Sequence, residues 1–175
     1  MEHSLSFSDL PERWDDLFEF PGYSVSDHGR VLNTRTGFYI KPTKNTRQLA
    51  IVGLMKNGVQ HKRSLPLLVA QAFVPKPQNA SFDTPVNLDG DRMNHHYTNL
   101  MWRPLWFARK YSQQFTDGHA TFDRPIEDVE TREIYHNSMH ASVVNGLLDV
   151  EIYLSMLNNT YVWPTGQIFR EVVLR

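Results

Sequence analysis

Two adjacent histidines, His95 and His96, follow two carboxylates, Asp89 and Asp91, and these four side chains are of the types that hydrolytic chemistry needs. An imidazole can take a proton from water near neutral pH, and carboxylates can hold a divalent cation. The spacing gives neither an H-x-x-x-H pair nor a paired-carboxylate motif. We therefore interpret Asp89-Gly90 as a turn and the two histidines as surface residues. The remaining histidines are scattered and are interpreted as ordinary polar positions: His28, His61, His119, His136 and His140.

The composition excludes several classes of protein. The chain of 175 residues is long enough for one domain with a proper core or for two small modules. It has no cysteine, which excludes disulfides and thiolate metal sites and fits a reducing cytosol. No apolar run approaches the roughly 18 residues of a transmembrane helix. The polar, acidic N-terminus is unlike a secretory signal or a transit peptide.

Charge is distributed unevenly along the chain, although the net charge is only −1. Residues 1–28 hold seven acids and one base, residues 29–116 hold thirteen bases and three acids, and residues 117–175 hold nine acids and four bases. Nine of the bases lie between Arg30 and Phe82 with no acid among them. Such a stretch of one sign is typical of contacts to phosphates. We therefore favour DNA binding over a merely solvated basic face.

The periodicity predicts strands first and helices afterwards. Strands are expected at 23–25, 30–32 and about 39–41, and a hairpin at 49–55 and 59–63 around Asn57-Gly58. Helical spacing follows at 65–73 and again at 98–115, where aromatic residues are more consistent with a core than with base stacking. In the last part, strands are expected at 126–129, 133–135, 161–163 and 167–173. Two helices are expected between them, at 139–147 capped by Ser138 and at 150–158 capped by Asp149.

Three stretches resemble the HNH homing endonucleases of phages. The first runs from Trp14 to Leu17 and from Pro21 to Val31, and is similar to the N-terminal module of that family. The second comprises residues 68–75, 86–94 and 99–102, and resembles the family's nuclease core, a ββα-metal finger. The third resembles the terminal helix-turn-helix repeat through Tyr135, Ser138, Ala141, the Asn145-Gly146 turn and the segment 166–170.

The resemblance implies an α+β fold with a small antiparallel N-terminal sheet, a degenerate ββα core and a C-terminal helix-turn-helix flanked by short strands. It places a sheet module for DNA binding at 1–63, the degenerate core at 64–115, a linker at 116–124 and the helix-turn-helix-like module at 125–175. In this family the N-terminal sheet lies in the DNA major groove.

The same resemblance implies that the catalytic residues are lost. The family's general-base histidine falls at Asn87, its metal-binding aspartate at Val86, its second metal ligand at Ala108 and an upstream histidine at Pro66. The asparagine that braces the finger is retained as Asn94. An amide cannot accept the proton, and losing the base and both ligands together removes the cation and its stabilisation of the phosphate. We therefore expect no catalytic residue and no metal, with His95 and His96 as the possible substitutes.

The DNA-facing side chains remain on or beside the predicted sheet. Arginine, glutamine and asparagine on strands suit base readout, so Arg35, Arg47 and Gln48 are the leading candidates for it. Lys44 and Lys56, with Lys62, are expected to hold phosphates. The full set of expected DNA-binding residues is Arg30, Arg35, Lys41, Lys44, Arg47, Gln48, Lys56, Lys62 and Arg63.

Three functions follow, of which the first is favoured. It is a non-catalytic protein that binds double-stranded DNA, needs no cofactor and acts as a transcriptional repressor or as a competitor at the locus of a phage or mobile element in the bacterial cytoplasm. The second is an active HNH endonuclease with a rearranged site, which would need Mg²⁺ or Mn²⁺. The third is a protein-interaction or virion component that uses the acidic ends. The acidic C-terminal module could also form a homodimer or bind a protein partner.

Overall fold

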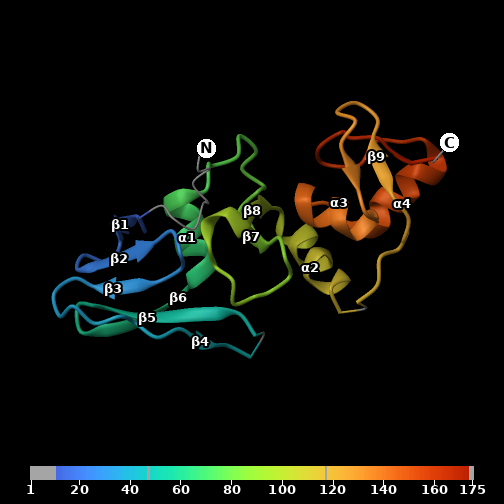
Figure 1. Cartoon of the computed structure of the whole chain (residues 1–175). Coiled ribbons are helices and arrows are strands. Elements are labelled where there is room, and N and C mark those ends of the chain that lie inside the picture. Colours follow the sequence, from blue (N-terminus) through green and yellow to red (C-terminus); the bar gives the residue numbers. More distant parts are fainter. Residues whose placement is uncertain (1–10, 47, 117, 174–175) are drawn as a thin grey trace, which may run out of the picture. The chain divides into compact units, whose positions relative to one another are not determined.

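The computed structural model describes residues 11–46, 48–116 and 118–173, which form small antiparallel sheets and four helices in a mixed α+β fold (Figure 1). The expected fold class is thus confirmed. The contacts divide the chain into two units, one of residues Met1–Ala80 and Asp91–Trp102 and the other of residues Ser81–Gly90 and Arg103–Arg175. This division is coarser than the four expected segments, so the boundaries after residues 63, 115 and 124 stay predictions.

The first sheet of the first unit has the strand order β1-β2-β3. Its strands are β1 (Trp14–Asp16), β2 (Tyr23–Ser26) and β3 (Val31–Asn33), so the two predicted strands are present within one residue and β1 was missed. The predicted strand at 39–41 is reduced to an isolated bridge between Tyr39 and Leu32. The three strands are antiparallel, and β2 is buried throughout.

The second sheet of this unit has the order β4-β5-β6 and contains the predicted hairpin. Its strands are β4 (Thr43–Lys44), β5 (Ala50–Lys56) and β6 (Val59–Ser64). Asn57 and Gly58 connect β5 to β6 with φ values of 52° and 78°. Positive φ at both residues is what a two-residue hairpin turn of the right twist requires, which is why the Asn-Gly pair predicted the turn correctly.

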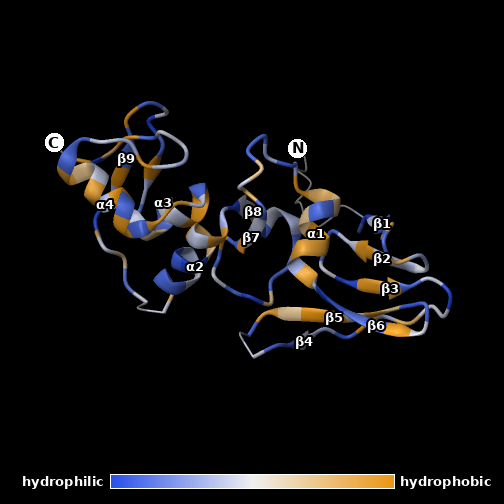
Figure 2. Ribbon diagram, turned by 180° about the vertical axis from the view of Figure 1, so that it is seen from behind, coloured by the Kyte–Doolittle hydropathy of each residue, from blue (hydrophilic) through white to orange (hydrophobic). Residues whose placement is uncertain are grey.

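Helix α1 (Leu65–Phe73) spans the predicted residues and covers the inner side of these sheets. It packs against β2, β5 and β6 with a face that is almost wholly apolar, and Figure 2 shows the apolar residues along α1 and β5. Pro66 lies in its first turn, where a missing N–H costs no helical hydrogen bond. The core of this unit includes Phe20, Val25, Val52, Leu54 and Val69.

The predicted helix at 98–115 is three elements instead of one. A short 3₁₀ helix η2 (Tyr97–Asn99) leads into strand β8 (Leu100–Arg103), and helix α2 (Leu105–Gln114) follows after Pro104. Strand β8, in which three of the four residues are buried, replaces the helix that the spacing of the aromatic residues predicted for the whole stretch. Strand β7 (Thr84–Asn87), which no pattern predicted, packs against α2 in the second unit.

The C-terminal part forms a sheet of order β10-β9-β11 and two consecutive helices. Its strands are β9 (Ile126–Asp128), β10 (Ile134–Tyr135) and β11 (Phe169–Glu171), and its helices are α3 (Ser138–Asn145) and α4 (Asp149–Asn158). The predicted pairing of 161–163 with 167–173 is limited to a Val162–Gln167 bridge, because β11 pairs with β9 instead.

The two predicted helix caps are wrong by one residue each. Asn137 caps α3, and its side chain accepts a hydrogen bond from the His140 N–H at 2.8 Å. Leu148 is the N-cap of α4, so Asp149 is the first helical residue, where its carboxylate accepts the N–H of Thr121. The helices close over a core of Ile126, Tyr135, Ala141, Leu147, Ile152, Val162 and Phe169. No helix in the described ranges is long and apolar enough to span a bilayer.

Candidate nucleic-acid interface

The sheet β4-β5-β6 has one buried face and one face that carries polar side chains. Ala50, Val52 and Leu54 alternate along β5 on the buried face. Strand register places Met55 opposite Gln60 and Gly53 opposite Lys62, on the other face. Gln60 and Lys62 are both exposed, and we call these four residues with Thr43 and Ile51 the outer face.

The expected DNA-binding cations fall into two groups, and the first is already engaged within the protein. Arg30 forms an ion pair with Glu12, and Arg63 lies 3.6 Å from a Glu19 carboxylate oxygen. Arg63 and Lys56 also stand over the Phe20 ring, at 4.7 and 5.7 Å from its centroid. These two side chains therefore lie on the buried side of the sheet and are less available to phosphates.

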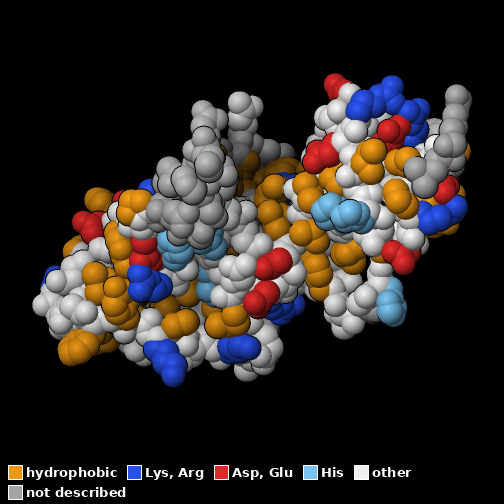
Figure 3. Space-filling model, viewed as in Figure 1, with side chains coloured by type: hydrophobic (Ala, Val, Ile, Leu, Met, Phe, Trp, Pro, Cys, Tyr) orange, Lys and Arg blue, Asp and Glu red, His pale blue; other side chains and the backbone are white. Residues whose placement is uncertain are grey.

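The second group of cations has no acidic partner. Lys41, Lys44 and Lys62 are exposed, and no ion pair or ring contact holds any of them within the described ranges. Figure 3 shows isolated Lys and Arg side chains over the part of this unit where Figure 1 places β4 and β5. An ammonium group without an internal partner contributes most to the affinity for a phosphate, because binding displaces only water and counterions.

The residues expected to read bases are not gathered on the outer face. Arg35 folds back over Gly22 and donates to the Pro21 carbonyl at 3.3 Å. Gln48 lies in the loop between β4 and β5 with a φ of 58°. Arg47 lies outside the described residues. Sequence reasoning missed Gln60, although two-residue alternation from the Asn57-Gly58 turn puts it on the face of Lys62 and would have identified it.

A second polar group in this unit contains two histidines. His28 Nδ1 lies 2.9 Å from Asp27 Oδ1, and the rings of His28 and His96 meet edge to face with centroids 4.7 Å apart. Burial raises the pKa of Asp27, but hydrogen bonds from Arg13 and His28 outweigh it and leave that pKa below its ordinary value. Burial and the charge of His28 lower the pKa of His96. In the tautomer that carries its proton on Nδ1, His28 donates that proton to Asp27 and leaves Nε2 as an acceptor.

The interpretation of His95 as a surface residue is wrong, because this residue is only 5% exposed. Neither ring nitrogen has a hydrogen-bond partner among the described residues, and burial lowers the pKa of His95. Its Cβ packs against Gly29, where an ideal Cβ would lie 2.6 Å away and where φ is 81°. A side chain enclosed in this way cannot reach a phosphodiester, so of the two possible substitutes only His96 has access to solvent.

The positions that the resemblance assigns to the nuclease site do not provide side-chain ligands for a cation. Val86 in β7 and Ala108 in α2 are buried and have no ligand atom, and Asn87 offers only an amide. Pro66 lies in the first turn of α1, and Asn94 precedes His95 in the first unit. We conclude that the residues present do not fit the divalent cation of a ββα-metal nuclease.

Among the described residues, Glu12, Asp27 and His28 are the one group of three acidic or histidine side chains whose ligand atoms lie close enough to share an ion. Both carboxylates are bound by guanidinium groups, Glu12 by Arg30 and Asp27 by Arg13. A cation would have to displace these partners, so the group is better described as an ion-pair network.

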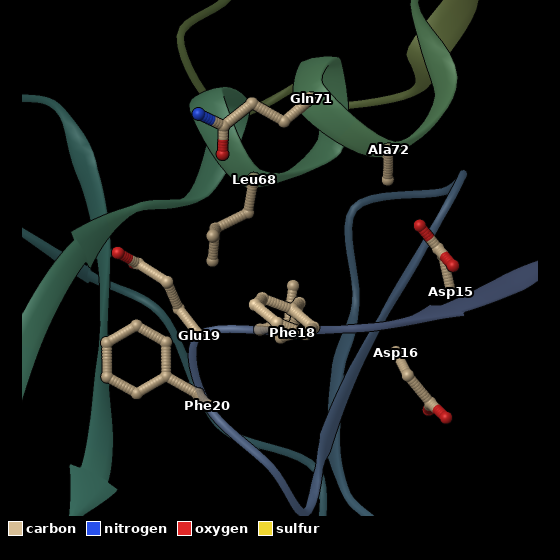
Figure 4. A pocket seen from close by; sticks show the side chains of 9 residues that line it. Asp15, Asp16, Phe18, Glu19, Phe20, Leu68, Gln71 and Ala72 are labelled. Atoms are coloured by element: carbon tan, nitrogen blue, oxygen red, sulfur yellow. The ribbon is translucent and has the colours of Figure 1, made fainter.

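An acidic pocket in the first unit is not suited to nucleic acid. It lies between the segment after β1 and helix α1, and Figure 4 shows the carboxylates of Asp15, Asp16 and Glu19 around it with Leu68 and Ala72 opposite. Phe18, which also lines it, is 99% exposed. Carboxylates at the mouth repel phosphates, so this pocket is a poor candidate for a nucleic-acid site.

The two C-terminal helices carry few groups that could bind phosphate. Three residues separate α3 from α4, and neither helix contains a lysine or an arginine. The arginines nearby are paired with acids: Arg124 with Glu171, and Arg132 and Arg170 with Glu127. Val150, Leu154 and Leu157 are exposed along one side of α4. This part of the chain therefore has a weaker electrostatic case for DNA binding than the sheet does.

Known proteins that are similar to this chain include HNH endonucleases. The chain is 29% identical over 101 residues to an uncharacterised HNH endonuclease of Acanthamoeba polyphaga mimivirus, which is 58% of this chain and 30% of that protein. A second HNH endonuclease of the same virus is 24% identical over 111 residues, which is 63% of this chain and 28% of that relative. The chain thus spans less than a third of the length of these curated relatives.

The HNH homing endonuclease I-HmuI has the same fold, and its solved structure describes how that enzyme binds and cleaves DNA. It covers 93% of this chain and 99% of its own, with a TM-score of 0.51 and 20% sequence identity. This likeness shows the fold. No family model matches the chain.

Proposed function

We propose that the chain is a non-catalytic protein that binds double-stranded DNA on the scaffold of an HNH homing endonuclease. The observation that carries the proposal is the outer face of β4-β5-β6, with exposed Lys62 and the unpaired Lys41 and Lys44 nearby. The relation to HNH endonucleases and the DNA binding by I-HmuI support the same partner.

The loss of catalysis rests on the chemistry of the matched positions. Val86 and Ala108 supply no oxygen, and Asn87 cannot take a proton from water. Removal of a general base alone costs roughly two to four orders of magnitude in rate. On this proposal the protein needs no cofactor and acts by occupying its site, as a repressor or as a competitor of an active endonuclease in a phage, virus or mobile element. Its place of action is then the cytoplasm of the host.

The test is binding and cleavage measured on the same duplex. We expect affinity that falls steeply with salt, and no nicked or linear product from supercoiled plasmid with Mg²⁺ or Mn²⁺. Restoring Asp and His at positions 86 and 87 in a Val86→Asp, Asn87→His variant tests whether the scaffold still tolerates the family's residues. Absence of binding at low salt, or metal-dependent cleavage by the unmodified protein, would refute the proposal.

A second function is favoured by one observation, the Asp27-His28 hydrogen bond beside His96. An imidazole oriented by a carboxylate is the form that a general base takes, so this group could serve a rearranged nuclease. Plasmid nicking that is lost in His28→Ala and His96→Ala, but kept in the buried His95→Ala, would establish this alternative over the first.

The C-terminal unit is assigned a separate role under the same proposal. Helices α3 and α4 follow each other as in a helix-turn-helix, yet they contain no lysine or arginine. The exposed apolar side of α4 suits a protein partner or a second copy better than a phosphate backbone. Light scattering of the free chain and of its DNA complex tests this role. A monomer in both states argues against a homodimer.

A further inference from the structure

We propose that Gln60 is a base-reading residue of the outer face, and that Gly53 leaves the space in which its amide lies. This inference rests on the proposed DNA binding and deepens it, because it assigns sequence preference to one side chain. The register places Gln60 opposite Met55 and diagonal to Gly53, at the exposed end of the β5-β6 hairpin.

The amide of Gln60 lies across Gly53. An ideal Cβ built on Gly53 would be 2.5 Å from Gln60 Nε2, 2.9 Å from its Cδ and 3.3 Å from its Cγ. A Cβ at position 53 would therefore force the end of the flexible Gln60 side chain to move, whereas glycine leaves the room that the amide occupies. Gly53 has no positive φ, so the turn chemistry that explains other glycines does not explain this one.

The amide has no partner that would account for its position. No hydrogen bond joins Gln60 to another group in the described ranges, and its side chain is exposed. An amide offers one donor side and one acceptor side, which match the N6 donor and N7 acceptor of adenine in the major groove. The lysines near it offer donors alone and suit phosphates. Gln60 is therefore the residue on this face best able to distinguish one base pair from another.

The lysine two residues further along β6 provides the matched comparison. Lys62 points to the same side of the same strand and lies opposite Gly53. If Lys62 holds a phosphate, its removal weakens binding to all sequences by a similar factor and lowers the salt slope by about one. If Gln60 reads a base, its removal weakens binding to the preferred sequence alone.

The experiment begins with selection of duplexes from a random pool by the unmodified protein, followed by affinity measurements on the selected duplex and on its single-base variants. We expect Gln60→Ala to lose on the order of 10- to 100-fold discrimination at one base pair, and to keep its affinity for random duplex. Gln60→Glu presents acceptors only, so its preference at that pair should move from adenine toward cytosine, whose N4 is a donor.

Gly53→Ala tests the positioning without removing the amide. Its methyl group should displace the Gln60 side chain and reduce discrimination at the same base pair, while Lys62→Ala leaves that discrimination intact. Thermal unfolding of each variant shows whether it folds. Because Gln60 is exposed, we expect its variants to fold. Full discrimination in Gln60→Ala, or a shared base preference in the unmodified protein and Gln60→Glu, would overturn the inference while DNA binding stands. Failure of the unmodified protein to bind any duplex would instead overturn the proposed function.

Discussion

At the scale of the residue, the cations of the first unit differ in whether an acidic side chain of the same unit already pairs with them. The nine bases between Arg30 and Phe82 identify a basic region correctly, because composition is a property of the sequence itself. The sequence does not show which of these bases are already paired within the protein. Arg30 is paired with Glu12, eighteen residues away, and Arg63 is paired with Glu19. Such pairs form only when the fold brings the partners together. Of the three lysines expected to hold phosphates, Lys56 stands over the Phe20 ring, whereas Lys44 and Lys62 have no ion pair or ring contact among the described residues.

The first prediction at this scale concerns the buried imidazole of His95. We expect His95→Leu to raise the free energy of unfolding by about 1 kcal/mol at pH 7.5, because it removes two ring nitrogens that have no hydrogen-bond partner. The gain should increase as the pH falls. Burial lowers the pKa of His95 in the folded protein. The unmodified protein therefore loses stability as the pH falls below the ordinary value of 6.5 and through the lower folded pKa.

Urea unfolding at pH 7.5 and 5.0 measures both effects. The control is His119→Leu, which replaces an exposed histidine of the other unit. A His95→Leu variant that is less stable than the unmodified protein at both pH values would show that the imidazole has a favourable partner which this structure does not give it.

At the scale of the element, local signals predicted what local chemistry decides. The Asn-Gly turn and the helix over 65–73 were found because their determinants lie within the elements themselves. The elements of region 98–115 were not predicted correctly, because tertiary packing buries most of β8 as a strand although the aromatic residues have a helical spacing. Strand β7 gave no signal, since only two of its four residues, Pro85 and Val86, are apolar.

Arg103, at the end of β8, stabilises an element far along the chain. Its guanidinium donates to the Gly146 carbonyl from Nε at 3.0 Å and from Nη2 at 2.9 Å, and to the Asn145 carbonyl at 3.2 Å. These carbonyls end helix α3, where a positive charge is favourable. Burial lowers the pKa of Arg103, which is 6% exposed, so the charge is held there by the bonds that it makes.

We expect Arg103→Met to lower the free energy of unfolding of the second unit by about 3 kcal/mol, because it leaves the carbonyls of Asn145 and Gly146 without their donor. Arg103→Lys should recover part of the loss, since an ammonium keeps the charge but not the fork of donors. Chemical denaturation of the three proteins gives the comparison. A loss below 1 kcal/mol in Arg103→Met would mean that water replaces the guanidinium at this helix end.

At the scale of the whole molecule, each unit contains a carboxylate whose pKa is held low. In the first unit this is Asp27. In the second unit burial raises the pKa of Asp128, but hydrogen bonds from Gln167 and from the backbone of Glu130 and Thr131 outweigh it. The contribution of each is present above the ordinary value of 3.8 and is lost as the pH falls through the lower folded pKa.

We therefore expect Asp27→Asn and Asp128→Asn to be destabilising at pH 6 and to approach the unmodified protein in stability as the pH falls below the ordinary value of 3.8. The exposed Asp15→Asn is the control for removal of a surface carboxylate. Urea midpoints measured from pH 6 to pH 2 test the prediction. A gap that stays constant across this range would mean that the native carboxylates titrate as they do in the unfolded chain.

The distribution of charge between the units leads to the last prediction, on the salt dependence of DNA binding. Each lysine that neutralises a phosphate contributes about 0.9 to the slope of log K against log salt concentration. Replacing Lys41, Lys44 and Lys62 together by glutamine should therefore reduce the slope by about 2.7 on any duplex. The matched control replaces three arginines of the second unit, Arg124, Arg132 and Arg170, which are bound to Glu171 and Glu127. It removes the same formal charge, yet it should leave the slope almost unchanged, because those cations are already neutralised within the protein. Equal losses in both triple variants would mean that net charge alone governs binding, and that the basic sheet has no special role in it.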